Sequence, residues 1–150
     1  MLTRFTLFGF ILLLITSGCN SQKKVTNPNE FNGNTLRFSS GGGFTGLTTT
    51  YTLLENGQLF SVTGVTEGSP KELSPVYSKK VKAVFDSAKK IQWPTSSISH
   101  PGNMSYSIAY KTAKKTHTVV WGDGNSTPPA DIDIAQLYKD LTQLISSPKQ

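Results

Sequence analysis

The chain has 150 residues, which is enough for one domain of ordinary size. It carries 15 basic and 9 acidic residues, for a net charge of +6 at pH 7, and a single cysteine. One cysteine excludes an internal disulfide framework and the zinc motifs built on paired cysteines. The stability of the fold therefore has to come from a hydrophobic core.

The first 18 residues have the layout of a secretory signal peptide. Residues 1–4 are short and carry one positive side chain, residues 5–15 read FTLFGFILLLI, and three small residues follow. The apolar run is well below the ~20 residues that a membrane-spanning helix needs. The sequence therefore predicts an exported protein from which the signal peptide, 1–18, is removed.

The end of this signal resembles the lipobox of bacterial lipoproteins, here Ile15-Thr16-Ser17-Gly18-Cys19, although Thr16 stands where the usual motif has leucine. The resemblance implies that Cys19 becomes the first residue and carries a diacylglycerol on its sulfur and a further chain, such as palmitate, on its amine. Each buried methylene contributes ~0.8 kcal/mol, so two or three chains anchor a protein stably. The cleavage context disfavours a cysteine buried in the core. We expect a lipid anchor at Cys19 and a location at the bacterial cell envelope.

Cleavage removes one of the 15 basic residues, Arg4, and none of the 9 acidic ones, which leaves a charge of +5. A basic face can bind nucleic acid or anionic lipid. An exported protein meets little nucleic acid, and lysine without arginine is poorly suited to bidentate phosphate recognition. We therefore favour a solvated lysine face and no nucleic-acid partner. The excess lies in two groups of lysines: Lys79, Lys80, Lys82, Lys89 and Lys90, and Lys111, Lys114 and Lys115.

Residues 19–34 are rich in Asn, Ser, Gln, Lys and Pro and have little to bury, so we expect a lipidated tether. A single domain is expected over 35–150. It begins with a strand at 35–40, TLRFSS, in which Leu36 and Phe38 share one face at a period of two.

A hairpin is expected at Asn56-Gly57, because both residue types tolerate the positive φ of a type I′ turn. A two-residue turn at this point places Leu53 opposite Phe60 and Tyr51 opposite Val62. All four side chains then share one side of the hairpin, which agrees with their apolar character.

A helix is expected from Ser74-Pro75, with Ser74 as its cap and Pro75 at its first position. It should end before Trp93-Pro94, since a residue that precedes proline disfavours the helical conformation. Its apolar stripe at helical spacing consists of Tyr77, Val81, Val84, Phe85 and Ala88.

A second hairpin and a last helix complete the domain. Pairing Lys111 with Thr116 places Ile108 opposite Val119 and Tyr106 opposite Trp121. The helix begins at about Asp131 and has an apolar stripe of Ile134, Leu137, Tyr138, Leu141, Leu144 and Ile145.

The fold class is α+β: an antiparallel sheet built from two hairpins plus an N-terminal strand, with two helices packed on one face. The expected core contains Tyr51, Leu53, Phe60, Val62, Val81, Phe85, Ile108, Val119, Leu137 and Leu141.

Groups that could carry catalysis are few. Of the two histidines, we expect His100 in a turn and His117 opposite Tyr110 at the end of a hairpin. Neither an HExxH run nor a GxSxG elbow is present, although a Ser-His-Asp arrangement assembled by the fold stays open. The run from Trp121 to Ser126 contains the Asp, Gly and Asn of a calcium loop but lacks the later glutamate, which favours a turn. We expect no enzyme activity, no metal site and no cofactor.

The glycine-rich stretch from Ser39 to Gly46 is the least ordinary part of the chain. A phosphate cradle would need a helix directly after it, but a strand pattern follows. The stretch is then either a bulged connection between two strands or a projecting loop that offers Phe44 and open backbone groups to a partner. The candidate partner-binding residues are Gly41, Gly42, Gly43, Phe44, Thr45 and Gly46.

Over most of residues 35–146 the chain is similar to the emfourin-type inhibitors of thermolysin-like metalloproteases. The resemblance is carried by Ser40-Gly42-Gly43-Phe44-Thr45-Gly46, Trp93-Pro94, Tyr106 to Tyr110 and the stripe from Leu137 to Leu144. The glycine motif has one extra glycine here, and the chain adds a lipid anchor that a soluble inhibitor does not need. The resemblance implies the α+β fold and inhibition of an exported metalloprotease.

Three functions therefore remain open. The first is a membrane-anchored lipoprotein with a small protein-binding domain, which inhibits a thermolysin-like metalloprotease. The second is a structural or accessory envelope lipoprotein without a protease target, and the third is a small hydrolase that uses His100 or His117. An exposed Phe44 favours the first over the second, whereas a serine and a carboxylate beside either histidine would favour the third.

Overall fold

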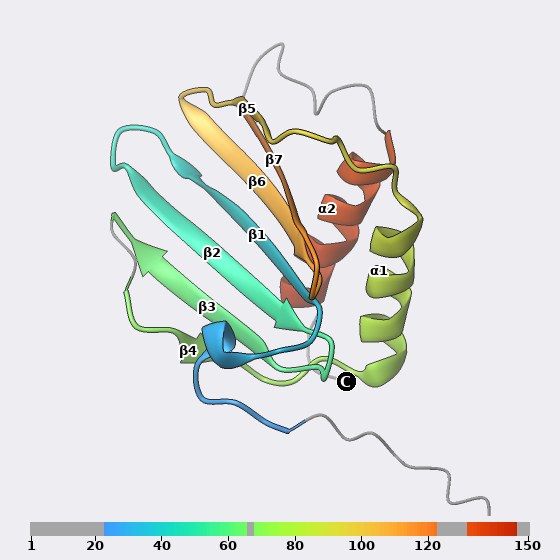
Figure 1. Cartoon of the computed structure of the whole chain (residues 1–150). Coiled ribbons are helices and arrows are strands. Elements are labelled where there is room, and N and C mark those ends of the chain that lie inside the picture. Colours follow the sequence, from blue (N-terminus) through green and yellow to red (C-terminus); the bar gives the residue numbers. More distant parts are fainter. Residues whose placement is uncertain (1–22, 66–67, 123–131, 147–150) are drawn as a thin grey trace, which may run out of the picture.

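The computed structural model describes residues 23–65, 68–122 and 132–146 (Figure 1). Among the described helices, none combines the length and the apolar character needed to cross a membrane. The elements, in chain order, are a 3-10 turn η1 (Pro28–Glu30), β1 (Thr35–Gly42), β2 (Leu47–Leu54), β3 (Leu59–Gly64), β4 (Lys71–Glu72), α1 (Ser78–Lys90), β5 (Ile98–His100), β6 (Met104–Lys111), β7 (Thr116–Gly122) and α2 (Ile132–Ser146).

The strands form one seven-stranded sheet in the order β4-β3-β2-β1-β6-β7-β5. β1 lies in the middle, antiparallel to both β2 and β6. The α+β class and the mostly antiparallel sheet are thus confirmed. The exception is β5, which pairs in parallel with β7, so that His100 lies opposite Trp121. The expectation that His100 belongs to a turn is wrong, because Ile98 to His100 form the edge strand.

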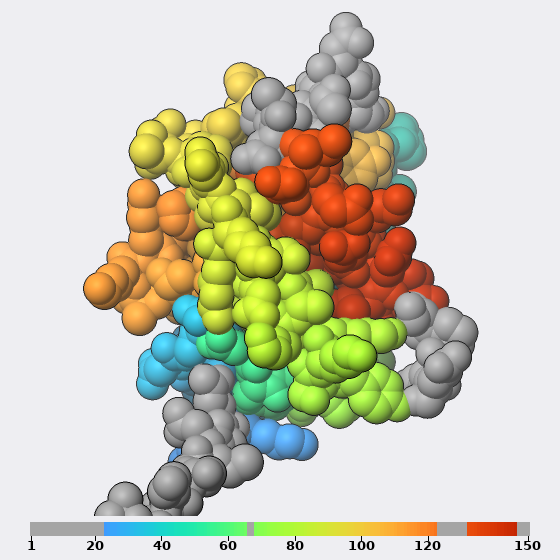
Figure 2. Space-filling view, turned by 90° about the vertical axis from the view of Figure 1, so that its right-hand side faces the viewer, coloured from blue at the N-terminus to red at the C-terminus, as the bar shows by residue number. Residues whose placement is uncertain are grey.

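The main hydrophobic core lies between the sheet and the helices. Figure 1 shows α1 and α2 on the same side of the sheet, and Figure 2 shows them side by side. Their buried residues form one cluster with residues of five strands and with Ile91, which directly follows α1: Leu36, Phe38, Leu53, Leu59, Val81, Val84, Phe85, Ala88, Ile91, Ile108, Tyr110, Val119, Trp121, Ile134, Leu137 and Leu141.

The register of the β6–β7 hairpin is confirmed. Ile108 pairs with Val119, Tyr106 with Trp121 and Lys111 with Thr116. Large apolar residues alternate with small ones along β6, so only one register buries all the large ones on the helix side.

The register predicted for the β2–β3 hairpin is wrong by one residue. Leu53 pairs with Leu59, not with Phe60. The backbone N–H of Leu54 donates to the carbonyl of Gln58 (2.9 Å), and that of Gly57 donates to the carbonyl of Leu54 (2.9 Å). These bonds close a three-residue loop with Gly57 at a φ of 93°, the longer hairpin connection that ends in a left-handed residue. The shift of one residue turns Phe60 and Val62 to the face away from the helices.

A second, smaller core covers this other face. Phe60 packs there with Leu54 and Phe31, and Val25 adds to the cluster. The buried Gln58 side chain binds the backbone of Val25 twice, accepting from its N–H and donating to its carbonyl, both at 2.9 Å. The segment from Val25 onward therefore belongs to the folded domain, and the expectation of a free tether over that segment is wrong.

Helix α1 begins at Ser78, three residues later than predicted. The backbone N–H of Leu73 donates to the carbonyl of Leu59 (2.8 Å), and that of Val76 donates to the carbonyl of Gly57 (2.9 Å). These bonds hold the residues around Ser74-Pro75 in an extended path along the β2–β3 hairpin. Tyr77 precedes the helix and is 61% exposed, so it is not part of the predicted stripe.

The ends of the two helices agree better with the sequence. Helix α1 ends at Lys90, before Trp93-Pro94 as predicted. The indole N–H of Trp93 donates to the carbonyl of Ala88 at 2.8 Å, which satisfies one of the last carbonyls of the helix. Helix α2 begins at Ile132 and buries Ile134, Leu137 and Leu141, and Asp131 lies outside the described residues.

Candidate binding tip

The connection between β1 and β2 is short. Gly42 pairs with Leu47, so four residues, Gly43 to Gly46, join the two strands. We call these four residues the tip. The backbone N–H of Gly46 donates to the carbonyl of Gly43 at 3.2 Å, and both glycines have a positive φ, 62° and 66°. The predicted glycine-rich loop is thus divided, with Gly41 and Gly42 inside β1 and the other four residues at its end.

The two glycines inside β1 are explained by contacts within the protein. A Cβ on Gly41 would lie 2.4 Å from the Cα of Thr48, and one on Gly42 would lie 2.4 Å from the carbonyl oxygen of Asn103. The same carbonyl accepts a hydrogen bond from the backbone N–H of Gly43 at 2.7 Å. Gly41 and Gly42 are therefore required by the close approach of neighbouring backbone within the domain and not by contact with a partner.

The tip itself is open. Phe44 is 108% exposed, and the neighbouring Leu47 is 47% exposed. A Cβ built on Gly46 would meet no atom within 4 Å. The tip therefore presents one large apolar ring on a backbone with little side-chain cover.

The strand below the tip is held from both faces of the sheet. On the helix side, the Tyr138 hydroxyl donates to the backbone carbonyl of Ser39 at 3.0 Å. Burial raises the pKa of the Tyr138 hydroxyl, which keeps it protonated as the donor. On the other face, the hydroxyls of Ser39 and Ser107 are hydrogen-bonded at 2.6 Å. The tip thus projects from a firmly placed strand and not from a loose loop.

The chain matches no protein-family model and no curated protein. The similarity to the emfourin-type inhibitors accordingly depends on the short motifs quoted above.

Neither of the two histidines belongs to the tip. The His117 ring stacks on Trp93 at 5.7 Å between centroids, and its Nδ1 lies 3.4 Å from the carbonyl oxygen of Pro94. His100 is exposed on the edge strand β5. In the part of the chain that the structure describes, neither ring is hydrogen-bonded to a serine or a carboxylate, and no three residues of His, Cys, Asp or Glu lie together as a metal site would require. Cys19 and the expected turn beyond Gly122 lie outside the described residues.

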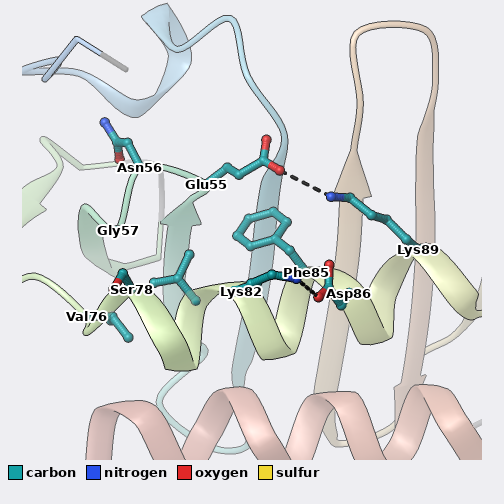
Figure 3. A pocket seen from close by; sticks show the side chains of 10 residues that line it. Glu55, Asn56, Gly57, Val76, Ser78, Lys82, Phe85, Asp86 and Lys89 are labelled. Atoms are coloured by element: carbon teal, nitrogen blue, oxygen red, sulfur yellow. Dashed lines mark hydrogen bonds and ion pairs between the residues drawn. The ribbon is translucent and has the colours of Figure 1, made fainter. Parts of the chain in front are cut away.

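The sequence did not point to a small pocket of about 260 Å³ between the β2–β3 loop and α1 (Figure 3). Phe85 lines its inner part. Lys89 pairs with Glu55 at 3.4 Å across the pocket, and Lys82 pairs with Asp86 along the helix. The hydrogen bond from Lys82 lowers the pKa of the Asp86 carboxyl. The pocket is smaller than the ~300–1,000 Å³ of typical ligand sites, and its charges are paired with one another, so it is a weaker candidate than the tip.

Proposed function

We propose that the protein is a lipid-anchored protein of the bacterial envelope that binds another exported protein through its tip. The supporting observation is the complete exposure of Phe44 at the end of a well-held strand. A large ring left in water forgoes roughly 1.5–3 kcal/mol of burial, and aromatic anchors are common hot spots of interfaces. The alternative, a structural or accessory envelope lipoprotein without a protein target, gives this exposed ring no role.

The partner class that we propose is a thermolysin-like metalloprotease. The support is the motif Ser40-Gly42-Gly43-Phe44-Thr45-Gly46, which is similar to that of the emfourin-type inhibitors. The four-residue tip is also narrow enough to enter the active-site cleft of a protease, because the other three residues of the tip, two glycines and a threonine, are small.

Phe44→Ala is expected to weaken inhibition of such a protease by at least about 30-fold, the effect of losing one hot-spot side chain. The measurement is a titration of thermolysin-like proteases with the mature chain from Asn20 onward. The matched control is Ile132→Ala, which removes an apolar side chain that is 81% exposed on α2 and should change nothing. Gly43→Val should also weaken inhibition, because Gly43 has a φ of 66° and its Cβ would lie 3.3 Å from the Met104 sulfur.

Two outcomes would count against this proposal. If no protease of this type is inhibited, the inhibitor function is wrong. If a partner is bound equally well by the folded Phe44→Ala and Gly43→Val variants, the site lies elsewhere on the domain.

Cys19→Ser is expected to abolish labelling of the protein by radioactive fatty acid. The reason is that Cys19 is the single cysteine of the chain, so no other thiol can accept the diacylglycerol. The variant should appear in the soluble fraction or as the uncleaved precursor, as judged by fractionation and mass. Undiminished labelling of the variant would refute the lipid anchor.

A further inference from the structure

We propose that the end of the domain opposite the tip is a membrane-contacting surface that recognises anionic lipid headgroups. The inference rests on the lipid anchor of the proposed function. We call this surface the basic end. It is defined by seven exposed lysines: Lys23, Lys24, Lys79, Lys80, Lys111, Lys114 and Lys115.

Three of these lysines, at the end of β6 and in the turn after it, lie beside the start of β1. Lys111 pairs with Thr35, the first residue of β1, while Gly42, its last residue, adjoins the tip. Lys114 and Lys115 follow in the β6–β7 turn, which a hydrogen bond from the backbone N–H of Thr112 to the carbonyl of Lys115 closes at 2.8 Å. At about 3.3 Å per residue, the eight residues of β1 separate these lysines from the tip by roughly 25 Å.

The other four lysines are brought to the same end by the β2–β3 loop. The side-chain amide of Asn56 in this loop donates to the carbonyl of Lys23 at 3.4 Å. The bond from the N–H of Val76 to the carbonyl of Gly57 places the first turn of α1, with Lys79 and Lys80, beside the same loop. Figure 1 shows the N-terminal segment, the β2–β3 loop and the start of α1 together at one end, and the β1–β2 connection at the other.

The charge of this end is positive despite some acidic residues. Glu30, Glu55 and Glu72 lie on the same side, but Glu55 is paired with Lys89 at 3.4 Å, so the lysines remain in excess. The opposite end differs sharply, since neither the stretch 41–49 nor the stretch 101–105 contains a charged residue. Within the described residues, the positive charge is therefore concentrated at one end of β1.

The folded segment at Val25 determines how far this end can move from the membrane. Val25 is held by Gln58 and lies six positions after Cys19, so the connection spans at most about 20 Å. The connection is short enough to let the lysines come within one Debye length, about 8 Å at physiological ionic strength, of the membrane surface, where they attract anionic headgroups. The anchor thus delivers the lysines to the lipid surface, and docking of the basic end turns the tip away from it.

The test uses the complete lipid-anchored protein reconstituted into vesicles. Because the single native cysteine carries the lipid, Ala113→Cys in the β6–β7 turn and Thr45→Cys in the tip each provide one reactive thiol for a fluorophore. A quencher on the lipid headgroups reports which position lies near the membrane. On vesicles with phosphatidylglycerol we expect strong quenching at position 113 and weak quenching at position 45. On phosphatidylcholine alone, or at about 0.5 M salt, the difference should disappear.

Charge removal provides the matched comparison. Replacing Lys111, Lys114 and Lys115 by Gln is expected to shift the docking equilibrium by roughly 100-fold, at about fivefold for each lysine. Replacing Lys82, Lys90 and Lys139 by Gln makes the same change in net charge on the exposed sides of the two helices and should leave the docking intact. Equal quenching at both positions, or quenching that is indifferent to lipid charge, would overturn the inference. Loss of the protein from the vesicles would refute the lipid anchor instead.

Discussion

Phe38→Ala is expected to lower the free energy of unfolding by about 3–5 kcal/mol. Phe38 is 1% exposed and lies on the central strand β1, stacked on Tyr51 at 5.3 Å and edge-on to Tyr138 at 6.4 Å. Truncation removes the ring from a packed layer between the sheet and α2, and neither tyrosine can move in without losing its own contacts. Urea unfolding followed by tryptophan fluorescence measures the loss.

Phe44→Ala is the control for this experiment, since it deletes the same atoms from a fully exposed site and should change stability by no more than about 0.5 kcal/mol. A loss below about 1 kcal/mol for Phe38→Ala would contradict the packing described here. The pair also serves the binding test, because a stable Phe44→Ala protein allows a loss of inhibition to be assigned to the tip and not to unfolding.

Gly42→Ala is expected to cost about 2–5 kcal/mol, because two unfavourable effects coincide at this position. Gly42 has a φ of 108°, a conformation that side-chain-bearing residues rarely adopt. A methyl group there would also lie 2.4 Å from the carbonyl oxygen of Asn103, which already accepts a bond from the N–H of Gly43. Thermal and urea unfolding of the variant measure the combined cost.

Gly46→Ala separates the two effects. Gly46 also has a positive φ, 62°, but a methyl group there would meet no atom within 4 Å, so only the backbone strain of about 1–2 kcal/mol remains. If Gly42→Ala destabilised the protein no more than Gly46→Ala, the backbone at Asn103 would be able to move away from the added methyl group at no cost. That result would contradict the close packing described beside the tip.

The two hairpins show what residue patterns can and cannot predict. In β6, Tyr106, Ile108 and Tyr110 alternate with small residues, so the pattern alone selects the correct register. In β2, Leu53 and Leu54 are both buried, one on each face, so alternation cannot decide between the two registers. Asn56-Gly57 is compatible with loops of two or three residues, and the shorter one was the wrong choice.

That single shift explains why the second core could not be predicted. Phe31 and Val25 pack against Phe60 on the face of the sheet away from the helices. The predicted register instead placed Phe60 on the helix side, which left Phe31 and Val25 without this contact. Without that partner, the polar composition of residues 19–34 indicates a tether. The short strands β4 and β5 were missed for a different reason, since two or three residues are too few to show any periodicity.

The sequence predicted where the candidate tip lies, but not which of its residues belong to β1 and which are exposed. The glycine run marked the β1–β2 connection, yet only the paired strands reveal that Gly41 and Gly42 accommodate the protein's own backbone. The exposure of Phe44 likewise follows from how tightly the strands close, which no local pattern encodes. The pocket beside α1 was invisible in the sequence because its walls come from a turn and a helix that meet only through packing.

The outermost strands of the sheet are its two shortest, β4 with Lys71–Glu72 and β5 with Ile98–His100. A long free edge offers a row of unpaired backbone groups to any neighbouring molecule, and edge-to-edge pairing of this kind begins aggregation. Here one outermost strand is two residues long and charged, and the other is followed at once by Pro101, which has no N–H to donate. Copies gathered on one membrane would be concentrated in two dimensions, the condition under which an open edge is most hazardous. If the proposed lipid anchor gathers copies in this way, the short outer strands leave them little free strand edge through which to pair.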